Sequence, residues 1–234
     1  MKILVINLLD RIDRLQTISS HLQSKGIEFQ VVKAVDKHDI PTRKSIFLTS
    51  DVERIFQSHL RCMEIAAKNV NDFSLILEDD SLLNIDATEL KLIVEAVEKS
   101  NIDFLQIGFL RLNIFDGFEI FLRNFNDYLI RMRIFSSFLS LFGFKESKRA
   151  NSQPWRKSLE RKFVLNDIRY GAHSYIVSSD FAKSILLLNE PNFLAIDDLF
   201  VSIGRMKSFR MARLRRSRSA QSLSKSSVMS RYNL

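Results

Sequence analysis

The chain has 234 residues, of which 46% are hydrophobic and 26% are charged, a composition typical of a folded globular protein. Its single cysteine, Cys62, excludes an internal disulfide and a metal site built from cysteines, and we expect a small buried helix residue there. The first apolar stretch is too short to cross a membrane and runs directly into charged residues, which argues against a signal peptide. We therefore expect a soluble fold that begins with a buried strand.

The net charge of +8 is distributed unevenly along the chain. Residues 205–231 contain lysine and arginine but no acidic residue, and the stretch beyond residue 207 is rich in serine and arginine. Exposed basic segments attract anionic molecules through their electrostatic field. The sequence therefore indicates an anionic partner, which could be nucleic acid, phospholipid headgroups or a phosphorylated substrate.

Strand-like and helix-like segments alternate along much of the chain. Short apolar runs, several of them rich in β-branched residues, predict strands at residues 2–8, 28–35, 73–77, 102–108 and 173–178. Segments with apolar side chains at helical spacing or with capping signals predict helices at residues 10–25, 50–68, 86–99, 179–188 and within 195–204. This alternation favours an α/β fold with a mostly parallel central sheet.

Local signals mark several helix ends. Gly26 follows the first helical segment at the position of a C-terminal cap. Ser50 with Glu53, and Asp86 with Glu89, have the spacing of a capping box, in which the first residue caps the helix and the acid lies three residues further on. We therefore expect helices to open at these two positions.

The regular alternation stops at Phe109. From there to Phe144 the chain has nine of its nineteen phenylalanines, interleaved with arginines and without one clean period. We interpret residues 109–169 as an insertion or subdomain. Regular segments then resume, and we expect Ser179 or Asp180 to cap the next helix.

Three consecutive acids, Glu78, Asp79 and Asp80, end the apolar strand at 73–77. In open α/β sheets, ligands bind beyond the carboxyl ends of the strands, where these residues fall. Side chains alternate along an extended backbone, so we expect Glu78 and Asp80 on one side and Asp79 on the other. Such a pair suits Mg²⁺ or Mn²⁺, which take one or two carboxylates together with waters and substrate phosphates. A solvated loop end or a helix cap would explain the same residues.

Six segments occur in an order that resembles a known family: "VINLLDRIDR", "LTSDVERIFQSH", "LILEDD", "DFLQIG", "AHSYIVSSDFAKSILL" and "IDDLF". In residues 1–108 and 170–204 the chain is similar to glycosyltransferase family 25, the bacterial lipooligosaccharide galactosyltransferase group. The resemblance implies a GT-A-like fold, which we expect as a single domain over residues 1–207 with a Phe/Arg-rich helical insertion at about 109–169. It also implies a UDP-sugar donor, usually UDP-galactose, a divalent cation (Mn²⁺ or Mg²⁺) and an acceptor sugar on the lipopolysaccharide core.

The resemblance assigns the acidic motif of the family to Glu78, Asp79 and Asp80. We expect Asp80 to be the direct metal ligand, and Glu78 to hold the ribose or a metal-bound water. We include Asp79 among the residues that bind the sugar donor.

The opening motif of the family, an Asn-Leu pair followed by spaced arginines, falls on Asn7, Leu8, Arg11 and Arg14. Arginine suits a diphosphate because its planar guanidinium stays charged and offers several N–H groups. Pairing of the two arginines with Asp10 and Asp13 on a solvated helix face is the alternative.

The Ser-His pair of the family falls on Ser58 and His59, which the resemblance implies as donor-binding residues. The sequence departs from the family just before this pair, because the usual Glu-x-Gly-Cys is replaced by residues 52–55, "VERI". A contact to the sugar donor could therefore be missing. A packed or capping histidine is the alternative for His59.

The late aspartate of the family falls on Asp197, with Asp198 beside it. A transfer that inverts the anomeric centre needs a carboxylate to take the proton of the attacking hydroxyl, while the metal stabilises the departing diphosphate. We expect these residues to be catalytic and the reaction to be inverting. A helix cap at one of them, or a retaining reaction, is the alternative.

The insertion and the tail at residues 208–234 allow several interpretations. The insertion could lie in a membrane interface or form a helical lid packed on the sheet. The tail could be solvated, bind phospholipid, or form a basic strand and loop that closes over the donor diphosphate. With a lipid-linked acceptor, we expect a cytoplasmic protein in peripheral contact with the inner face of the bacterial inner membrane.

Two other classes of function compete with a transferase. A Mg²⁺-dependent phosphotransferase or phosphatase would also gather acids after parallel strands, but the sequence has only six glycines and no glycine-rich phosphate loop. A non-enzymatic nucleic-acid-binding protein would explain the basic end of the chain. It would leave the acidic strand end unexplained, so we expect no nucleic-acid partner.

Overall fold

The computed structural model describes residues 1–39, 48–69, 72–109, 163–188 and 194–221. Residues 110–162, which make up most of the expected insertion, lie outside this part of the chain, and so do residues 222–234 at the end of the expected tail. The predicted lid or membrane-interface role of the insertion therefore stays a prediction.

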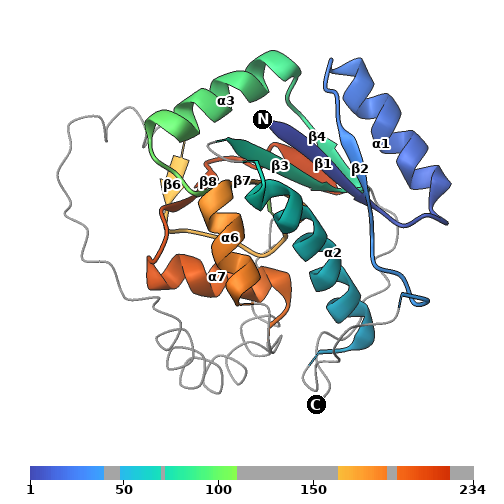
Figure 1. The fold of residues 1–234 in the computed structure, drawn as a ribbon. Helices are drawn as coiled ribbons and strands as arrows, with labels where there is room; N and C mark the ends of the chain where they lie inside the picture. Colours follow the sequence, from blue (N-terminus) through green and yellow to red (C-terminus); the bar gives the residue numbers. More distant parts are fainter. Residues whose placement is uncertain (40–47, 70–71, 110–162, 189–193, 222–234) are drawn as a thin grey trace, which may run out of the picture.

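A seven-stranded sheet forms the centre of the described structure (Figure 1). Its strands, in spatial order, are β2 (Gln30–Lys33), β1 (Lys2–Asn7), β3 (Phe73–Glu78), β7 (Ser174–Ser178), β5 (Phe104–Gly108), β8 (Met211–Leu214) and β6 (Phe163–Leu165). Five strands run in one direction, and only β7 and β6 run in the other. The expected α/β fold with a mostly parallel central sheet is confirmed. Beside it, β4 (Ser81–Leu83) and β9 (Ser219–Gln221) pair in a small antiparallel sheet.

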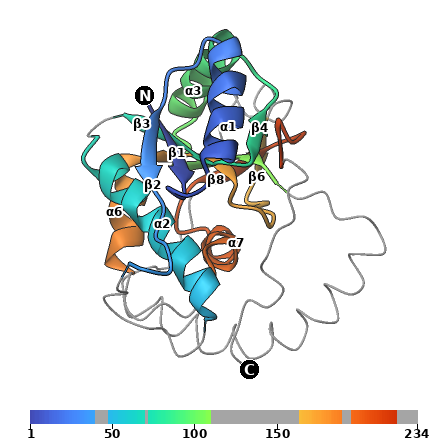
Figure 2. The same cartoon turned by 90° about the vertical axis from the view of Figure 1, so that its right-hand side faces the viewer.

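Helices cover both faces of the sheet, which gives three layers (Figures 1 and 2). One face carries α1 (Ile12–Ser24) and α3 (Ala87–Lys99), and the other carries α2 (Ser50–Ala67), α6 (Ser179–Leu187) and α7 (Ile196–Met206). The alternation of side chains along β3 shows the arrangement, because Leu75 and Leu77 pack in the core under α1 and α3 while Ile76 packs under α2 and α6. The alternating apolar side chains of this strand therefore pack into two separate cores, one on each face of the sheet.

Two of the predicted helix ends are confirmed. Asp86 precedes α3, and its carboxylate accepts a hydrogen bond of 2.8 Å from the Glu89 backbone N–H. Gly26 follows α1 with a φ of 68°, in the left-handed region that glycine adopts without steric cost. Cys62 is buried within α2, as expected, and burial raises the pKa of its thiol.

Two other helices are capped one residue before the expected position. Thr49, not Ser50, occupies the N-cap position of α2, and Ser178 rather than Ser179 caps α6. Both capping residues have extended backbone conformations, whereas the residues that follow are already helical. The Ser178 hydroxyl accepts a hydrogen bond of 3.2 Å from the Phe181 backbone N–H.

The sheet continues beyond residue 207, where the sequence predicted a tail. Strand β8 is buried at all four positions, pairs parallel with β5 and antiparallel with β6, and β9 pairs with β4. Arg213 is buried within β8 because its guanidinium pairs with Asp167 and lies 5.1 Å from the centre of the Phe109 ring. Residues 208–221 are therefore part of the fold and not a separate tail, which agrees with the strand in the expected alternative of a basic strand and loop.

Candidate active site at the carboxyl edge of the sheet

The predicted site residues lie where β1 and β3 end. These two strands are parallel neighbours, with Ile6 paired to Glu78, so Asn7 and the three acids emerge at the same edge of the sheet. Backbone hydrogen bonds fix the acidic turn, residues 78–80, against β7, because the Glu78 N–H donates to the His173 carbonyl at 3.0 Å. Segments that are about seventy residues apart in sequence meet here.

Asp79 is buried and bound by two side chains from the first part of the chain. Its carboxylate accepts hydrogen bonds from Asn7 Nδ2 at 2.8 Å and from Arg14 Nη1 at 3.1 Å. Burial nevertheless raises the pKa of Asp79, and these two partners only partly oppose that effect. Asn7 and Arg14 therefore hold the acidic turn in place.

Asp80 is the least satisfied of the three acids. Its side chain is 14% exposed, and its Oδ2 lies 3.9 Å from Arg14 Nη1. Its Oδ1 is buried and has no hydrogen-bond partner among the described residues. Burial, together with the charges of Glu78 and Asp79, raises the pKa of Asp80 to about 6. An additional positive charge at this oxygen would stabilise the ionised form.

Glu78 has a different environment. Burial alone would raise the pKa of Glu78, but a hydrogen bond from His59 and the positive charges nearby lower it below its ordinary value. His59 Nε2 lies 3.3 Å from Glu78 Oε1, and the Glu78 side chain keeps 28% exposure. This carboxylate is therefore ionised, fixed by the protein and open on one side.

The side-chain alternation expected for the acids differs from the observed pairing. Arg14 contacts both Asp79 and Asp80, whereas Glu78 pairs with His59. Strand β3 ends at Glu78 and the next two residues form a turn, so the rule for extended backbone no longer applies.

The two arginines of the opening motif have different partners. Arg14 points to the acidic turn, but Arg11 pairs with Asp13, its Nε lying 3.1 Å from Asp13 Oδ1. The hydrogen bond from Arg11 lowers the pKa of Asp13 to about 2. Arg11 therefore matches the alternative of an arginine paired with an aspartate on a solvated helix face. Leu8, the other residue of the opening motif, is half-buried and packs against the core.

Ser58 and His59 are both buried, and their side chains bind protein groups. Ser58 Oγ donates to the Arg54 carbonyl at 2.7 Å and accepts from the Val35 N–H at 2.8 Å, which ties α2 to the chain after β2. His59 is only 1% exposed and lies between Glu78 and Tyr175. In this geometry both residues position other groups, and direct contact with a sugar donor stays only a prediction from the resemblance.

Asp197 and Asp198 lie in the first turn of α7, where the helix dipole favours negative charge. Ala195 occupies the N-cap position, so neither aspartate is the cap. Asp198 is buried, whereas Asp197 is half-buried, which makes Asp197 the more accessible carboxylate. Burial raises the pKa of Tyr175, and the charges of Glu78 and Asp197 contribute to this shift, so both carboxylates act on one tyrosine.

Tyr175 and His173 belong to the site but were not predicted from the sequence. Tyr175 lies in a stretch that reads as an ordinary apolar strand, and only its place in a family motif could have signalled it. His173 accepts hydrogen bonds at its carbonyl from Glu78 and from the Ser81 hydroxyl, and its ring packs over Gly108. A Cβ atom at Gly108 would clash with His173 Nε2, so glycine leaves room for this ring.

The acids do not form a complete metal cage of protein ligands. Within the described ranges, no group of three or more His, Cys, Asp or Glu side chains could hold a metal ion. The buried Oδ1 of Asp80 does fit an ion that takes one or two carboxylates and completes its coordination with water and phosphate oxygens.

A mostly parallel sheet that places carboxylates beyond its strand ends defines the chain as an α/β protein with a candidate ligand site at that edge. Residues 1–200 match the sequence profile of glycosyltransferase family 25, described as a family of lipopolysaccharide biosynthesis proteins. The chain belongs to this family, and the resemblance noted in the sequence is confirmed. The match supports a glycosyltransferase of lipopolysaccharide biosynthesis and includes every predicted site residue. No curated protein sequence gives a significant match to the chain.

The described helices carry no candidate membrane span. None of them is both long enough and apolar enough to cross a bilayer.

Proposed function

We propose that this protein transfers a sugar, galactose, from a UDP-sugar to an acceptor on the lipopolysaccharide or lipooligosaccharide core in a reaction that depends on Mn²⁺ or Mg²⁺. The observation that carries the proposal is the buried Asp80 Oδ1, which has no hydrogen-bond partner among the described residues, at the ligand edge of a family 25 sheet. Burial and the charges of Glu78 and Asp79 raise the pKa of Asp80, so added positive charge would stabilise its ionised form. A cation brought by the sugar donor would supply that charge.

Each carboxylate of the acidic turn has a separate role in the proposal. Asp80 holds the cation, and a bound divalent cation stabilises negative charge on a departing diphosphate. Glu78, which is ionised and open on one side, holds a ribose hydroxyl or a water of the cation. Arg14 and Asn7 keep Asp79 in place beneath them.

Asp197 is the proposed general base. It takes the proton of the acceptor hydroxyl as the hydroxyl oxygen bonds to the anomeric carbon and the bond from that carbon to the UDP oxygen breaks. Attack opposite the leaving group inverts the anomeric configuration. The greater exposure of Asp197 supports its choice over the buried Asp198.

We also propose peripheral contact with the anionic inner face of the bacterial inner membrane. Arg215, Arg216 and Arg218 are exposed on the loop between β8 and β9. Basic side chains at a surface attract anionic headgroups, each contributing about 1 kcal/mol. A lipid-linked acceptor would be presented at the same interface.

A thermal-shift panel tests the proposed function. UDP-galactose, UDP-glucose and UDP are added with Mn²⁺, with Mg²⁺ or with a chelator, because a ligand that binds only the folded state raises the melting temperature. We expect UDP-galactose to stabilise the protein only when a divalent cation is present, and we expect Asp80→Asn to lose this response. The exposed Asp180→Asn serves as the matched control. Equal stabilisation with the chelator would contradict the role of the cation, and stabilisation by inorganic phosphate alone would favour a phosphotransferase.

A further inference from the structure

Three side chains from three different elements form a continuous chain of hydrogen bonds into the core. Tyr175 Oη of β7 lies 2.7 Å from His59 Nδ1 of α2, and His59 Nε2 lies 3.3 Å from Glu78 Oε1 at the end of β3. Tyr175 and His59 are buried, whereas Glu78 reaches the surface. Only the Glu78 end of this chain can therefore touch a ligand.

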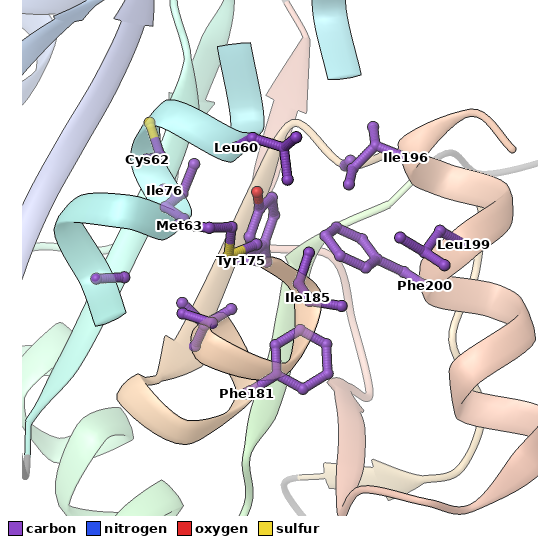
Figure 3. Packing of buried hydrophobic residues seen from close by; sticks show 14 of the residues in the cluster. Leu60, Cys62, Met63, Ile76, Tyr175, Phe181, Ile185, Ile196, Leu199 and Phe200 are labelled. Carbon is purple, nitrogen blue, oxygen red and sulfur yellow. The ribbon is translucent and has the colours of Figure 1, made fainter. Parts of the chain in front are cut away.

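Aromatic packing fixes the inner end of the chain. The Tyr175 ring stacks on Phe104 with centroids 5.3 Å apart and meets the edge of Phe200 at 5.0 Å. Figure 3 shows the ring enclosed by the core cluster, with its hydroxyl oxygen at the end away from Phe181. A ring held on its faces cannot swing, so the hydroxyl stays at one point beside His59.

The chemistry of the three groups sets the direction of the hydrogen bonds. An ionised carboxylate can only accept hydrogen bonds. His59 Nε2 therefore carries a proton and donates a hydrogen bond to Glu78. In the neutral ring, Nδ1 then has a lone pair, which accepts the hydrogen bond of the Tyr175 hydroxyl. Every buried proton in this arrangement has an acceptor, which a buried polar group requires.

We propose that His59 and Tyr175 are positioning residues that hold the Glu78 carboxylate in one orientation for the sugar donor. This inference rests on the proposed function, and it gives His59 an indirect role in place of the direct donor contact that the resemblance implies.

Two substitutions of His59 separate positioning from packing. In His59→Gln the amide nitrogen replaces Nε2 and can still donate to Glu78, whereas in His59→Asn the amide replaces Nδ1 and the contact with Glu78 is lost. Calorimetry measures UDP-galactose affinity with Mn²⁺. We expect His59→Asn to weaken affinity about 10- to 100-fold, as for groups that orient a ligating side chain, and His59→Gln to restore most of it. Equal losses in the two variants would overturn the proposal.

Tyr175→Phe tests the inner end of the chain without changing the packed ring. Loss of one buried hydrogen bond predicts a weakening of donor affinity of between about twofold and tenfold. Tyr170→Phe, at a half-buried tyrosine outside the network, is the control and should bind normally. An unchanged affinity in Tyr175→Phe would show that Glu78 needs no support from the core and would overturn the assignment of Tyr175.

A double-mutant cycle measures the coupling free energy between His59 and Glu78, which general destabilisation of the protein does not change. If His59 acts only through Glu78, then Glu78→Gln combined with His59→Asn should bind UDP-galactose no more weakly than Glu78→Gln alone. Additive losses would show that His59 contacts the donor or acts through other residues, and would overturn the proposal. Melting temperatures of all variants confirm that each is folded.

Nitrogen-15 NMR of the histidine rings tests the network without any donor. In the neutral His59 ring we expect the proton on Nε2 and none on Nδ1, with His59→Gln used to assign the signals among the four histidines. A bare Nε2 would contradict the hydrogen bond to Glu78 and overturn the proposal. If the unmodified protein binds no UDP-sugar, the proposed function fails, and the NMR result alone then decides whether His59 and Tyr175 hold Glu78.

Discussion

On the α2 side of the acidic turn, Glu78 receives a hydrogen bond from His59, which is itself fixed by Tyr175. On the α1 side, Asp79 and Asp80 share Arg14, and one buried oxygen of Asp80 has no hydrogen-bond partner in the described part of the chain. The pKa of Glu78 is accordingly lowered, while the pKa of Asp80 is raised to about 6.

Adjacent carboxylates on one turn therefore have opposite requirements. The protein itself supplies Glu78 with a hydrogen bond from His59. Asp79 and Asp80, in contrast, share the single positive charge of Arg14. A built-in shortage of this kind costs stability, and a ligand that brings a cation would remove the cost. The protein thus fixes Glu78 through hydrogen bonds, and it leaves Asp80 Oδ1 without a hydrogen-bond partner among the described residues.

The largest expected effect is on turnover and comes from Asp197, in the first turn of α7. Asp197→Asn removes the proposed base and should lower the rate of sugar transfer about 10²- to 10⁴-fold, the usual range for general-base loss. UDP and Mn²⁺ binding should stay near normal, because this carboxylate acts on the acceptor. Initial rates and calorimetry measure the two quantities. Loss of UDP binding in Asp197→Asn would place this residue at the donor instead.

Substitution of Asp80, on the α1 side of the acidic turn, should mainly weaken binding of the sugar donor. Asp80→Asn keeps the shape of the side chain but removes the charge that holds a hard cation. We expect Mn²⁺-dependent UDP-galactose affinity to fall by more than about tenfold, with Asp180→Asn as the unaffected control. Titration calorimetry with and without Mn²⁺ measures this, and normal affinity in Asp80→Asn would remove this residue from the metal site.

The same substitution should stabilise the protein when cations are removed. Because the folded pKa of Asp80 is about 6 and its ordinary value is 3.8, the stability that protonated Asp80 provides is complete below about pH 4 and is lost as the pH rises through 6. At pH 7 in a chelator, Asp80→Asn should therefore raise the free energy of unfolding by at most about 3 kcal/mol. Urea unfolding at pH 4 and pH 7 measures the difference, which should close at the lower pH. A variant that is less stable at pH 7 would contradict the charge shortage.

The smallest expected effect concerns the basic loop between β8 and β9, residues 215–218. Because β8 lies in the sheet, deletion of residues 208–234 would disturb the fold, so individual charges are replaced instead. Arg215→Gln with Arg216→Gln should weaken binding to anionic vesicles by about 2 kcal/mol at low salt, and added salt should reduce the difference. Lys68→Gln with Lys99→Gln is the control of equal charge. Equal weakening in both pairs would indicate a net-charge effect without a membrane-binding loop.

Local patterns in the sequence were sufficient to predict most of the layered fold. The alternating apolar runs located β1, β3, β5 and β7, and the Asp86–Glu89 spacing located the start of α3. These signals depend only on residues a few positions apart, so they can be recognised without knowing how the rest of the chain folds. The position of the three acids at the edge of the sheet was predicted for the same reason, because they directly follow an apolar strand, although the turn that they form was not.

The partners of each acid, in contrast, were decided only by the tertiary structure. His59 is 19 residues from Glu78 and 116 from Tyr175, and Arg14 is 65 residues from Asp79. Periodicity does not encode such contacts, since they depend on which elements the sheet order brings together. For a related reason the sequence offered strand β8 only as one of three interpretations of the tail: the burial of Arg213 depends on Asp167 and Phe109, which are distant in sequence. The sequence by itself determined that three carboxylates stand at the edge of the sheet, and only the packing of α1, α2 and β7 around them decided that Glu78 is satisfied by the protein and Asp80 is not.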